Sequence, residues 1–133
     1  MREVFRAMSS FETAFEKVYR ITLNEAMILC ILKDATERMT ATNLSKSTDL
    51  SPSHTSKMLR ILEEKGLIER KMLNGNRRTF HIFMTESGKK NQKLVEEAFK
   101  KIEKTALNGI SEEEQKLFMD IFCRIYRNLA DMK

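Results

Sequence analysis

The sequence predicts a mainly α fold that contains one small β-hairpin. Apolar residues recur at steps of three and four over most of the 133 residues, as they do along amphipathic helices. The only proline of the chain, Pro52, follows a serine, which is typical of the first position of a helix. Asn74-Gly75 separates two short segments rich in branched and aromatic residues, and this pair is a strong signal for a tight hairpin.

Size and composition favour a single folded domain over residues 1–133. A content of 41% hydrophobic and 32% charged residues is typical of globular proteins. The apolar runs, such as Ala26–Leu32, are far shorter than the roughly 20 residues that span a bilayer. The N-terminal residues carry acids and lack the apolar core of a secretory signal, so we expect a cytoplasmic protein without membrane contact.

The first part of the chain predicts three helices. An amphipathic helix is expected over about residues 3–20. Its stripe consists of Val4, Phe5, Met8, Phe11, Phe15, Val18 and Tyr19. Thr22 and Glu25 form a capping box, and Leu23–Leu32 is apolar almost all round, so the second helix should be central to the core. A third, shorter helix is predicted over Thr42–Thr48.

The segment DLSPSHTSKMLRILEEKGLIER, residues 49–70, predicts the second half of a helix-turn-helix. Ser51 suits the N-cap, and Pro52 suits the first helical position because the missing N–H would lack a partner there anyway. Gly66 can take the left-handed conformation that ends a helix, so we expect a helix over Pro52–Lys65. Only two residues separate Thr48 from Ser51, which favours a tight turn between two helices.

The residues that follow predict a basic hairpin. Leu67–Met72 and Thr79–Met84 are the expected strands, with Arg77 and Arg78 at the tip between them. A basic hairpin directly after the second helix of a helix-turn-helix is the wing of a winged helix-turn-helix domain. We place this domain at about residues 36–88.

The chain continues with two further amphipathic helices, over about residues 89–131. Thr85 caps the first of them, and a Ser111–Glu114 capping box opens the second. The last stripe consists of Leu117, Phe118, Ile121, Phe122, Ile125 and Leu129. A winged helix needs neither terminal segment for its own core, so we predict N- and C-terminal dimerisation helices and a homodimer.

Taken together, these motifs resemble the MarR family of bacterial transcriptional regulators over nearly the whole chain. The resemblance rests on LSPSHTSKMLRILEEKGLIER and on NRRTFHIFMTESG, in which Asn76-Arg77-Arg78 fills the wing motif. The family usually has aspartate where this chain has Asn76, and leucine where it has Met84. The resemblance implies a DNA-binding regulator, a ligand-responsive repressor acting on a pseudo-palindromic operator. It also implies a crevice for a small-molecule effector near Tyr19 and Met27.

The charge pattern agrees with a DNA partner. The net charge is +5, and seven cations against three acids between Lys57 and Arg78 leave +4 in that segment alone. Such a field attracts phosphate polyanions, although a basic cluster by itself is also compatible with a solvated surface.

Two groups of residues are the expected contacts with double-stranded DNA. The first turns of a recognition helix point into the major groove, and wing arginines reach the minor groove. The expected contacts are Ser51, Ser53, His54, Ser56, Lys57 and Arg60 on the helix, and Asn76, Arg77 and Arg78 on the wing. The alternative is that Ser53 only supports the cap while Lys57 and the arginines are solvated charges.

No enzymatic or metal-binding constellation is evident, and no cofactor is expected. His54 and His81 lack metal-ligand spacing with the two cysteines, and no phosphate-binding glycine loop is present. Cys30 and Cys123 lie in apolar stretches, which favours buried reduced thiols over redox sensors. The competing functional hypothesis is a winged-helix module that binds another protein and does not bind DNA.

Overall fold

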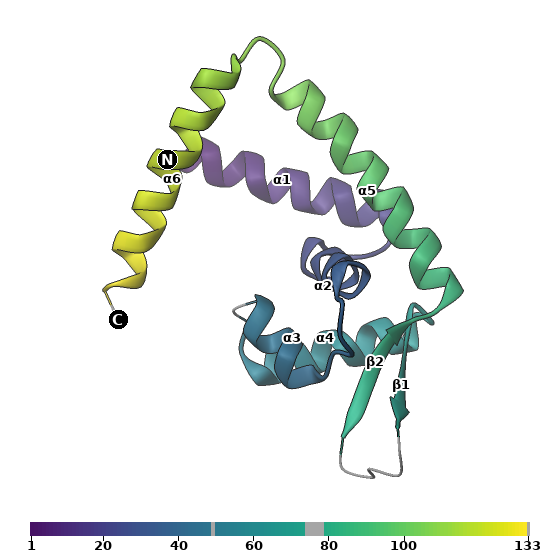
Figure 1. Cartoon of the computed structure of the whole chain (residues 1–133). Helices are drawn as coiled ribbons and strands as arrows, with labels where there is room; N and C mark the ends of the chain where they lie inside the picture. Colours follow the sequence, from purple (N-terminus) through teal and green to yellow (C-terminus); the bar gives the residue numbers. More distant parts are fainter. Residues whose placement is uncertain (49, 74–78, 133) are drawn as a thin grey trace. The chain divides into compact units, whose positions relative to one another are not determined.

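The computed structural model describes residues 1–48, 50–73 and 79–132, and within them it contains six helices and a two-stranded sheet (Figure 1). The helices are α1 Arg2–Tyr19, α2 Leu23–Asp34, α3 Ala41–Thr48, α4 Pro52–Glu64, α5 Glu86–Ala106 and α6 Glu112–Ala130. The strands are β1 Ile68–Met72 and β2 Phe80–Met84. The mainly α fold with one small hairpin is therefore confirmed. The chain divides into two compact units, Met1–Glu97 and Ala98–Lys133, and the single domain over residues 1–133 stays a prediction.

A sharp corner joins α1 to α2. Arg20 takes the left-handed conformation with φ 63°, and its backbone N–H donates to the Glu16 carbonyl at 2.8 Å, which closes the last turn of α1. Thr22 then caps α2, and the reciprocal hydrogen bonds with Glu25 confirm the predicted capping box. The chain thus leaves α1 and enters α2 within three residues.

Helices α3 and α4 form the predicted helix-turn-helix. Leu44 is fully buried, and the Ser45 hydroxyl donates to the Leu50 carbonyl at 2.8 Å, which ties α3 to the turn. The Ser51 side chain accepts from the His54 backbone N–H at 3.2 Å, and Pro52 occupies the first helical position. Gly66 has φ 74°, so the predicted C-terminal stop is confirmed.

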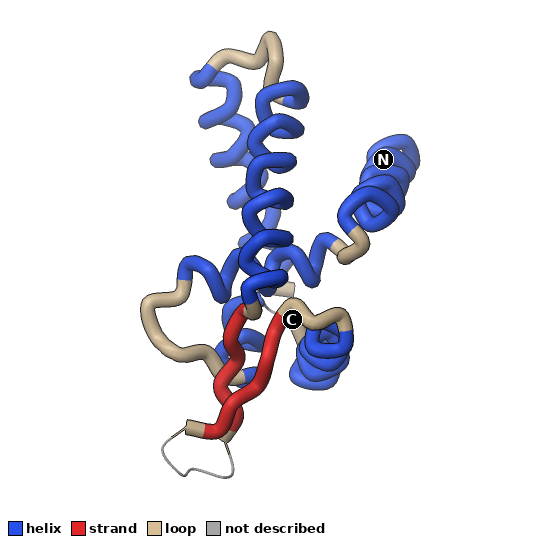
Figure 2. The backbone as a smooth tube through the Cα atoms, turned by 90° about the vertical axis from the view of Figure 1, so that its right-hand side faces the viewer, coloured by secondary structure: helices blue, strands red, loops and turns tan. Residues whose placement is uncertain are grey.

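The hairpin is antiparallel, with Arg70 opposite Ile82, and Figure 2 shows its two strands side by side. Its predicted turn at Asn74-Gly75 lies outside the described residues. Met39 forms a bridge to β2 through a hydrogen bond from the Ile82 N–H to the Met39 carbonyl at 2.8 Å, which the sequence reading missed. Ile82 is buried, whereas Phe80 at the outer end of the strand is 46% exposed.

The core of the first unit collects apolar side chains from its helices and from the hairpin. The residues exposed by less than 2% include Ile21, Ile28, Leu29, Leu44, Leu59, Leu62, Ile68 and Val95. Lys33 on α2 donates a hydrogen bond to Glu96 on α5, which raises the pKa of Lys33. These contacts hold α4 and the base of the hairpin on one scaffold.

Helix α6 shows an uncovered apolar face. The Ser111–Glu114 capping box is present as predicted, yet no residue of α6 is buried. The large apolar side chains at Phe118, Phe122 and Leu129 are each more than half exposed. Across the described residues, no helix is both long and apolar enough to cross a bilayer.

The prediction of two buried thiols is wrong for Cys123, which is exposed, while Cys30 is half-buried. Cys123 is exposed because no residue of α6 is buried, so its apolar neighbours along the chain do not cover the thiol. At about 100° per residue, Cys123 lies on the face of α6 that carries Lys116 and Arg127, away from Phe118 and Phe122.

Gly88 is required by a close backbone approach at the start of α5. A Cβ at this position would lie 2.0 Å from the Leu67 carbonyl oxygen, which also accepts from the Thr85 N–H at 3.0 Å. Since a backbone atom cannot give way without loss of that hydrogen bond, Gly88→Ala is expected to lower the free energy of unfolding by about 1–3 kcal/mol. Urea denaturation followed by circular dichroism measures the change.

Ser87→Ala is the matched control, because Ser87 is exposed in the same helical turn. Equal unfolding free energies for Gly88→Ala and the wild-type protein would contradict the predicted clash.

Candidate nucleic-acid interface

Helix α4 is fixed to the core by one side and exposes the other. Thr55, Met58, Leu59 and Leu62 are buried. The exposed residues of the opposite side are Ser53, Ser56, Lys57 and Arg60. Two hydroxyls, an ammonium and a guanidinium therefore project together from a helix that the core holds in place. We call these four residues the reading face.

The helical geometry separates the reading face from a flank that His54 and Ile61 form. At about 100° per residue, Ser53, Lys57 and Arg60 lie within about 60° of one another around the helix axis. His54 and Ile61 lie to one side of them, next to Lys57. His54, which the sequence predicts as a DNA contact, is exposed as well and borders the reading face.

A cavity of about 340 Å³ adjoins that flank. Glu12 and Glu16 of α1 line it together with His54, Lys57 and Ile61 of α4. Lys57 thus borders both the cavity and the exposed reading face. Neither Tyr19 nor Met27, the two residues expected near an effector, is among the described residues that line the cavity.

Ser51 has a structural task in addition to its predicted contact with DNA. Its hydroxyl oxygen accepts from the His54 N–H and so satisfies one of the free amides at the start of α4. The hydroxyl proton can still be donated, and a phosphate oxygen is a suitable acceptor for it. Cap and contact are therefore compatible at this residue.

Ion pairs reduce the basic cluster that the sequence count suggested. Lys65 Nζ lies 3.0 Å from Glu25 Oε2, Arg70 Nε lies 3.3 Å from Glu63 Oε2, and Lys71 Nζ lies 3.1 Å from Glu69 Oε1. These three cations contribute little net field, since each has an acid beside it. Among the described cations of the segment, the positive charge that faces outward is concentrated at Lys57 and Arg60.

The predicted wing contacts at Asn76, Arg77 and Arg78 lie outside the described residues. The strands that lead to them are described, and only three residues separate the end of α4 from the start of β1. Reading face and hairpin thus belong to adjacent elements of the same unit (Figure 1). Within the described part of the chain, no three His, Cys, Asp or Glu side chains are grouped as a metal ion would require.

Comparison with known sequences gives one family and several relatives. A model of the MarR family matches residues 21–80. The HTH-type transcriptional regulator YwhA of Bacillus subtilis (strain 168) is 33% identical over 86 residues, which make up 65% of this chain and 62% of that protein. The HTH-type transcriptional regulator YdgJ of the same organism is 23% identical over 119 residues, 90% of this chain and 72% of that protein. The chain thus spans less than two thirds of YwhA.

Solved structures share the fold at low sequence identity. A MepR–DNA complex from S. aureus has a TM-score of 0.83 at 23% identity and covers 96% of this chain and 93% of its own. FabT from Streptococcus pneumoniae, in complex with DNA, has a TM-score of 0.76 at 24% identity. The match covers 99% of this chain and 96% of the FabT chain. The architecture of α1 to α6 with its hairpin is therefore shared with these two proteins.

Proposed function

We propose that the chain is a MarR-family transcriptional regulator that binds double-stranded DNA in a sequence-specific manner, since a model of that family matches residues 21–80. The observation that carries the proposal is the reading face of α4, which is polar and exposed while the opposite side of the helix is buried. A helix held in this way can enter the major groove with its side chains already oriented. The complexes of MepR and FabT with DNA support this role for the shared fold.

Base reading is assigned to Ser53, Ser56 and Lys57. Hydroxyls and an ammonium can meet the donors and acceptors of base edges. Arg60 lies further along the helix, where a phosphate is the natural partner, and Ser51 and His54 support the contact from the cap and the flank. Arg77 and Arg78, with Asn76 beside them, are assigned to the minor groove and the phosphates next to it.

The active form is proposed to be a homodimer that uses its first and last helices. Phe5 and Met8 of α1 and Phe118 and Phe122 of α6 are all more than half exposed in the single chain. Exposed apolar stripes of this length are unfavourable in water, and a second copy of the chain can bury them in a symmetric interface. Two recognition helices related by a two-fold axis then match a pseudo-palindromic operator.

A small-molecule effector is the proposed release signal, with repression as the default state. The cavity beside α4 supports this part of the proposal, because an occupant would touch His54 and Lys57 directly. Tyr19 and Met27 remain the residues that the family resemblance suggests for an effector. The proposal assigns no enzymatic activity, and it places the protein in the cytoplasm, where the DNA of a bacterium lies.

Selection from a library of random duplexes tests the proposal. The protein should enrich a pseudo-palindrome whose half-sites lie about one helical turn apart. Ser56→Ala and Lys57→Ala should each weaken binding to the selected site by about 1–3 kcal/mol and binding to scrambled duplexes by less. Fluorescence anisotropy with both duplexes measures the difference.

Lys93→Ala is the matched control for Lys57→Ala, because Lys93 is an exposed lysine on α5. Enrichment of a single unrepeated motif would contradict the dimer, and no enrichment at all would favour a module that binds another protein.

A further inference from the structure

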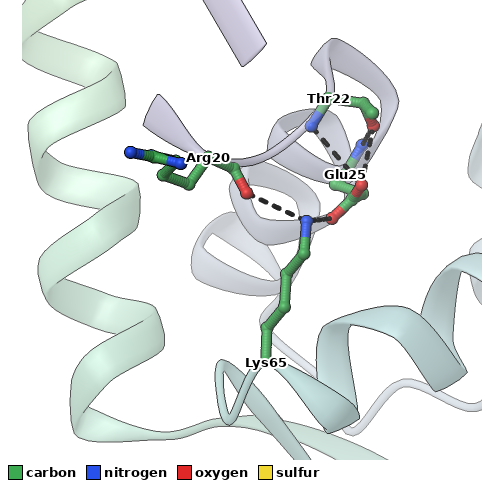
Figure 3. A network of polar contacts seen from close by, with 4 residues as sticks. All are labelled: Arg20, Thr22, Glu25 and Lys65. Atoms are coloured by element: carbon green, nitrogen blue, oxygen red, sulfur yellow. Dashed lines mark hydrogen bonds and ion pairs between the residues drawn. The ribbon is translucent and has the colours of Figure 1, made fainter. Parts of the chain in front are cut away.

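One ammonium group joins the ends of three helices. Lys65 Nζ donates to the Arg20 carbonyl oxygen at 2.9 Å and to Glu25 Oε2 at 3.0 Å (Figure 3). Arg20 is the C-cap of α1, Glu25 lies in the first turn of α2, and Lys65 is the C-cap of α4. The helix that carries the reading face is therefore connected by a single side chain to the corner between α1 and α2.

The carboxylate in this network is buried and fully engaged. Glu25 is only 3% exposed, and its Oε1 accepts from the Thr22 hydroxyl at 3.1 Å while Oε2 receives the lysine. A buried carboxylate that loses its cation is strongly unfavourable, which constrains the Lys65 ammonium group to stay beside Glu25. The exposed pair between Lys89 and Glu86 has no such constraint.

The second contact of Lys65 depends on the backbone of Arg20. The left-handed conformation of Arg20 ends α1 and leaves its carbonyl oxygen available to the ammonium group. A cation at the C-terminal end of a helix also interacts favourably with the helix dipole. Lys65 thus contacts both the end of α1 and the start of α2.

We propose that Lys65 is a positioning residue for DNA recognition, which fixes the direction of α4 relative to α1. This inference rests on the proposed function, because α1 is assigned to the dimer interface and α4 to the major groove. In a dimer, the angle between these two helices in each chain sets the distance between the two reading faces. Lys65 therefore determines which spacing of half-sites the protein accepts, without touching DNA.

The first test measures the orientation directly and needs no DNA. Spin labels at Ser10→Cys on α1 and Arg60→Cys on α4, in a Cys30→Ser, Cys123→Ser background, report the α1–α4 distance within one chain. Labelled protein is diluted with unlabelled protein so that only distances within a chain are recorded. Lys65→Met should broaden the distance distribution, and Lys65→Arg should restore a narrow one. Lys89→Met, which breaks only the exposed pair with Glu86, should leave it unchanged.

The second test uses the operator selected by the wild-type protein and a version with one base pair inserted between the half-sites. The wild-type protein should discriminate between them, and Lys65→Met should lose about tenfold of that discrimination, since residues that couple distant elements have effects of this size. Binding to random duplexes should change equally little in Lys65→Met and Lys89→Met.

A second variant covers the case in which Lys65→Met does not fold. Glu25→Gln combined with Lys65→Met removes both charges, and the amide oxygen can still accept from Thr22 and preserve the cap of α2. This variant should fold and should show a broad distribution of α1–α4 distances. It should also discriminate poorly between the two operator spacings.

Each result decides the inference. A narrow distribution of α1–α4 distances in the double variant would show that Lys65 does not fix the direction of α4. A broad distribution with unchanged discrimination between the two operator spacings would show that Lys65 has no role in DNA recognition. Failure of the wild-type protein to bind any duplex would overturn the proposed function and, with it, the role of Lys65 in DNA recognition. The distances between the spin labels would still decide whether Lys65 fixes the direction of α4 relative to α1.

Discussion

Placing glutamate at both Phe118 and Phe122 is expected to turn a dimeric protein into monomers and to abolish tight binding to a two-half-site operator. The stacked pair of rings, with centroids 6.1 Å apart, lies on the exposed apolar stripe of α6. A dimer would bury four new carboxylates without partners. Even about 1 kcal/mol for each carboxylate weakens association by roughly a thousandfold, and unpaired buried charges usually cost more.

Loss of the dimer should also be visible in DNA binding. A monomer reaches one half-site and forfeits the gain from engaging two linked sites, which is typically about 10²–10⁴-fold. Light scattering measures the mass, and anisotropy with the operator measures the affinity. Lys116→Gln with Arg127→Gln changes the charge by the same amount on the other face of α6, so this control should remain dimeric. A wild-type protein that is folded and monomeric at micromolar concentration would refute the dimer model.

Raising the salt concentration from 50 to 200 mM should weaken DNA binding by about a thousandfold or more. Three cations per chain, Arg60, Arg77 and Arg78, are assigned to phosphates. A dimer doubles them to about six phosphate contacts, each of which releases condensed counterions. Removal of one of these cations should lower the slope of log affinity against log salt by about 1.8, because the dimer carries two copies.

Affinity titrations over a salt series compare Arg60→Ala, Arg77→Ala and Arg78→Ala with the wild-type protein. Lys104→Ala in the last turn of α5 is the control and should leave the slope unchanged. An unchanged slope for Arg78→Ala would remove the wing from the interface, and unchanged slopes for all three would reject the electrostatic model.

The helix boundaries could be predicted from the sequence because local contacts determine them. The caps at Thr22, Ser51 and Ser111 each involve a partner only three residues away. Gly66 ends α4 through its own backbone conformation. Both members of each interaction therefore lie within the same short segment of the sequence.

Contacts between distant segments were not predictable in this way. Glu25 and Lys65 are 40 positions apart, and the bridge between Met39 and Ile82 also joins separate elements. The number of charges along the chain does not reveal that Lys65, Arg70 and Lys71 each have an acid beside them. The reading face of α4 was predictable because the buried and exposed residues alternate with the helical period.

The hairpin is closed at its base by two hydrogen bonds, and this closure makes it an exchangeable part. The Thr85 hydroxyl donates to the Gly66 carbonyl at 2.6 Å, and the Thr85 N–H donates to the Leu67 carbonyl at 3.0 Å. Ile68 and Ile82 in the strands next to these bonds are buried in the core, whereas Phe80 at the outer end of β2 is exposed. Substitutions at the outer end therefore need not disturb the helices. A designer can therefore graft other sequences onto the outer end of the hairpin to retarget the protein while the helices stay the same.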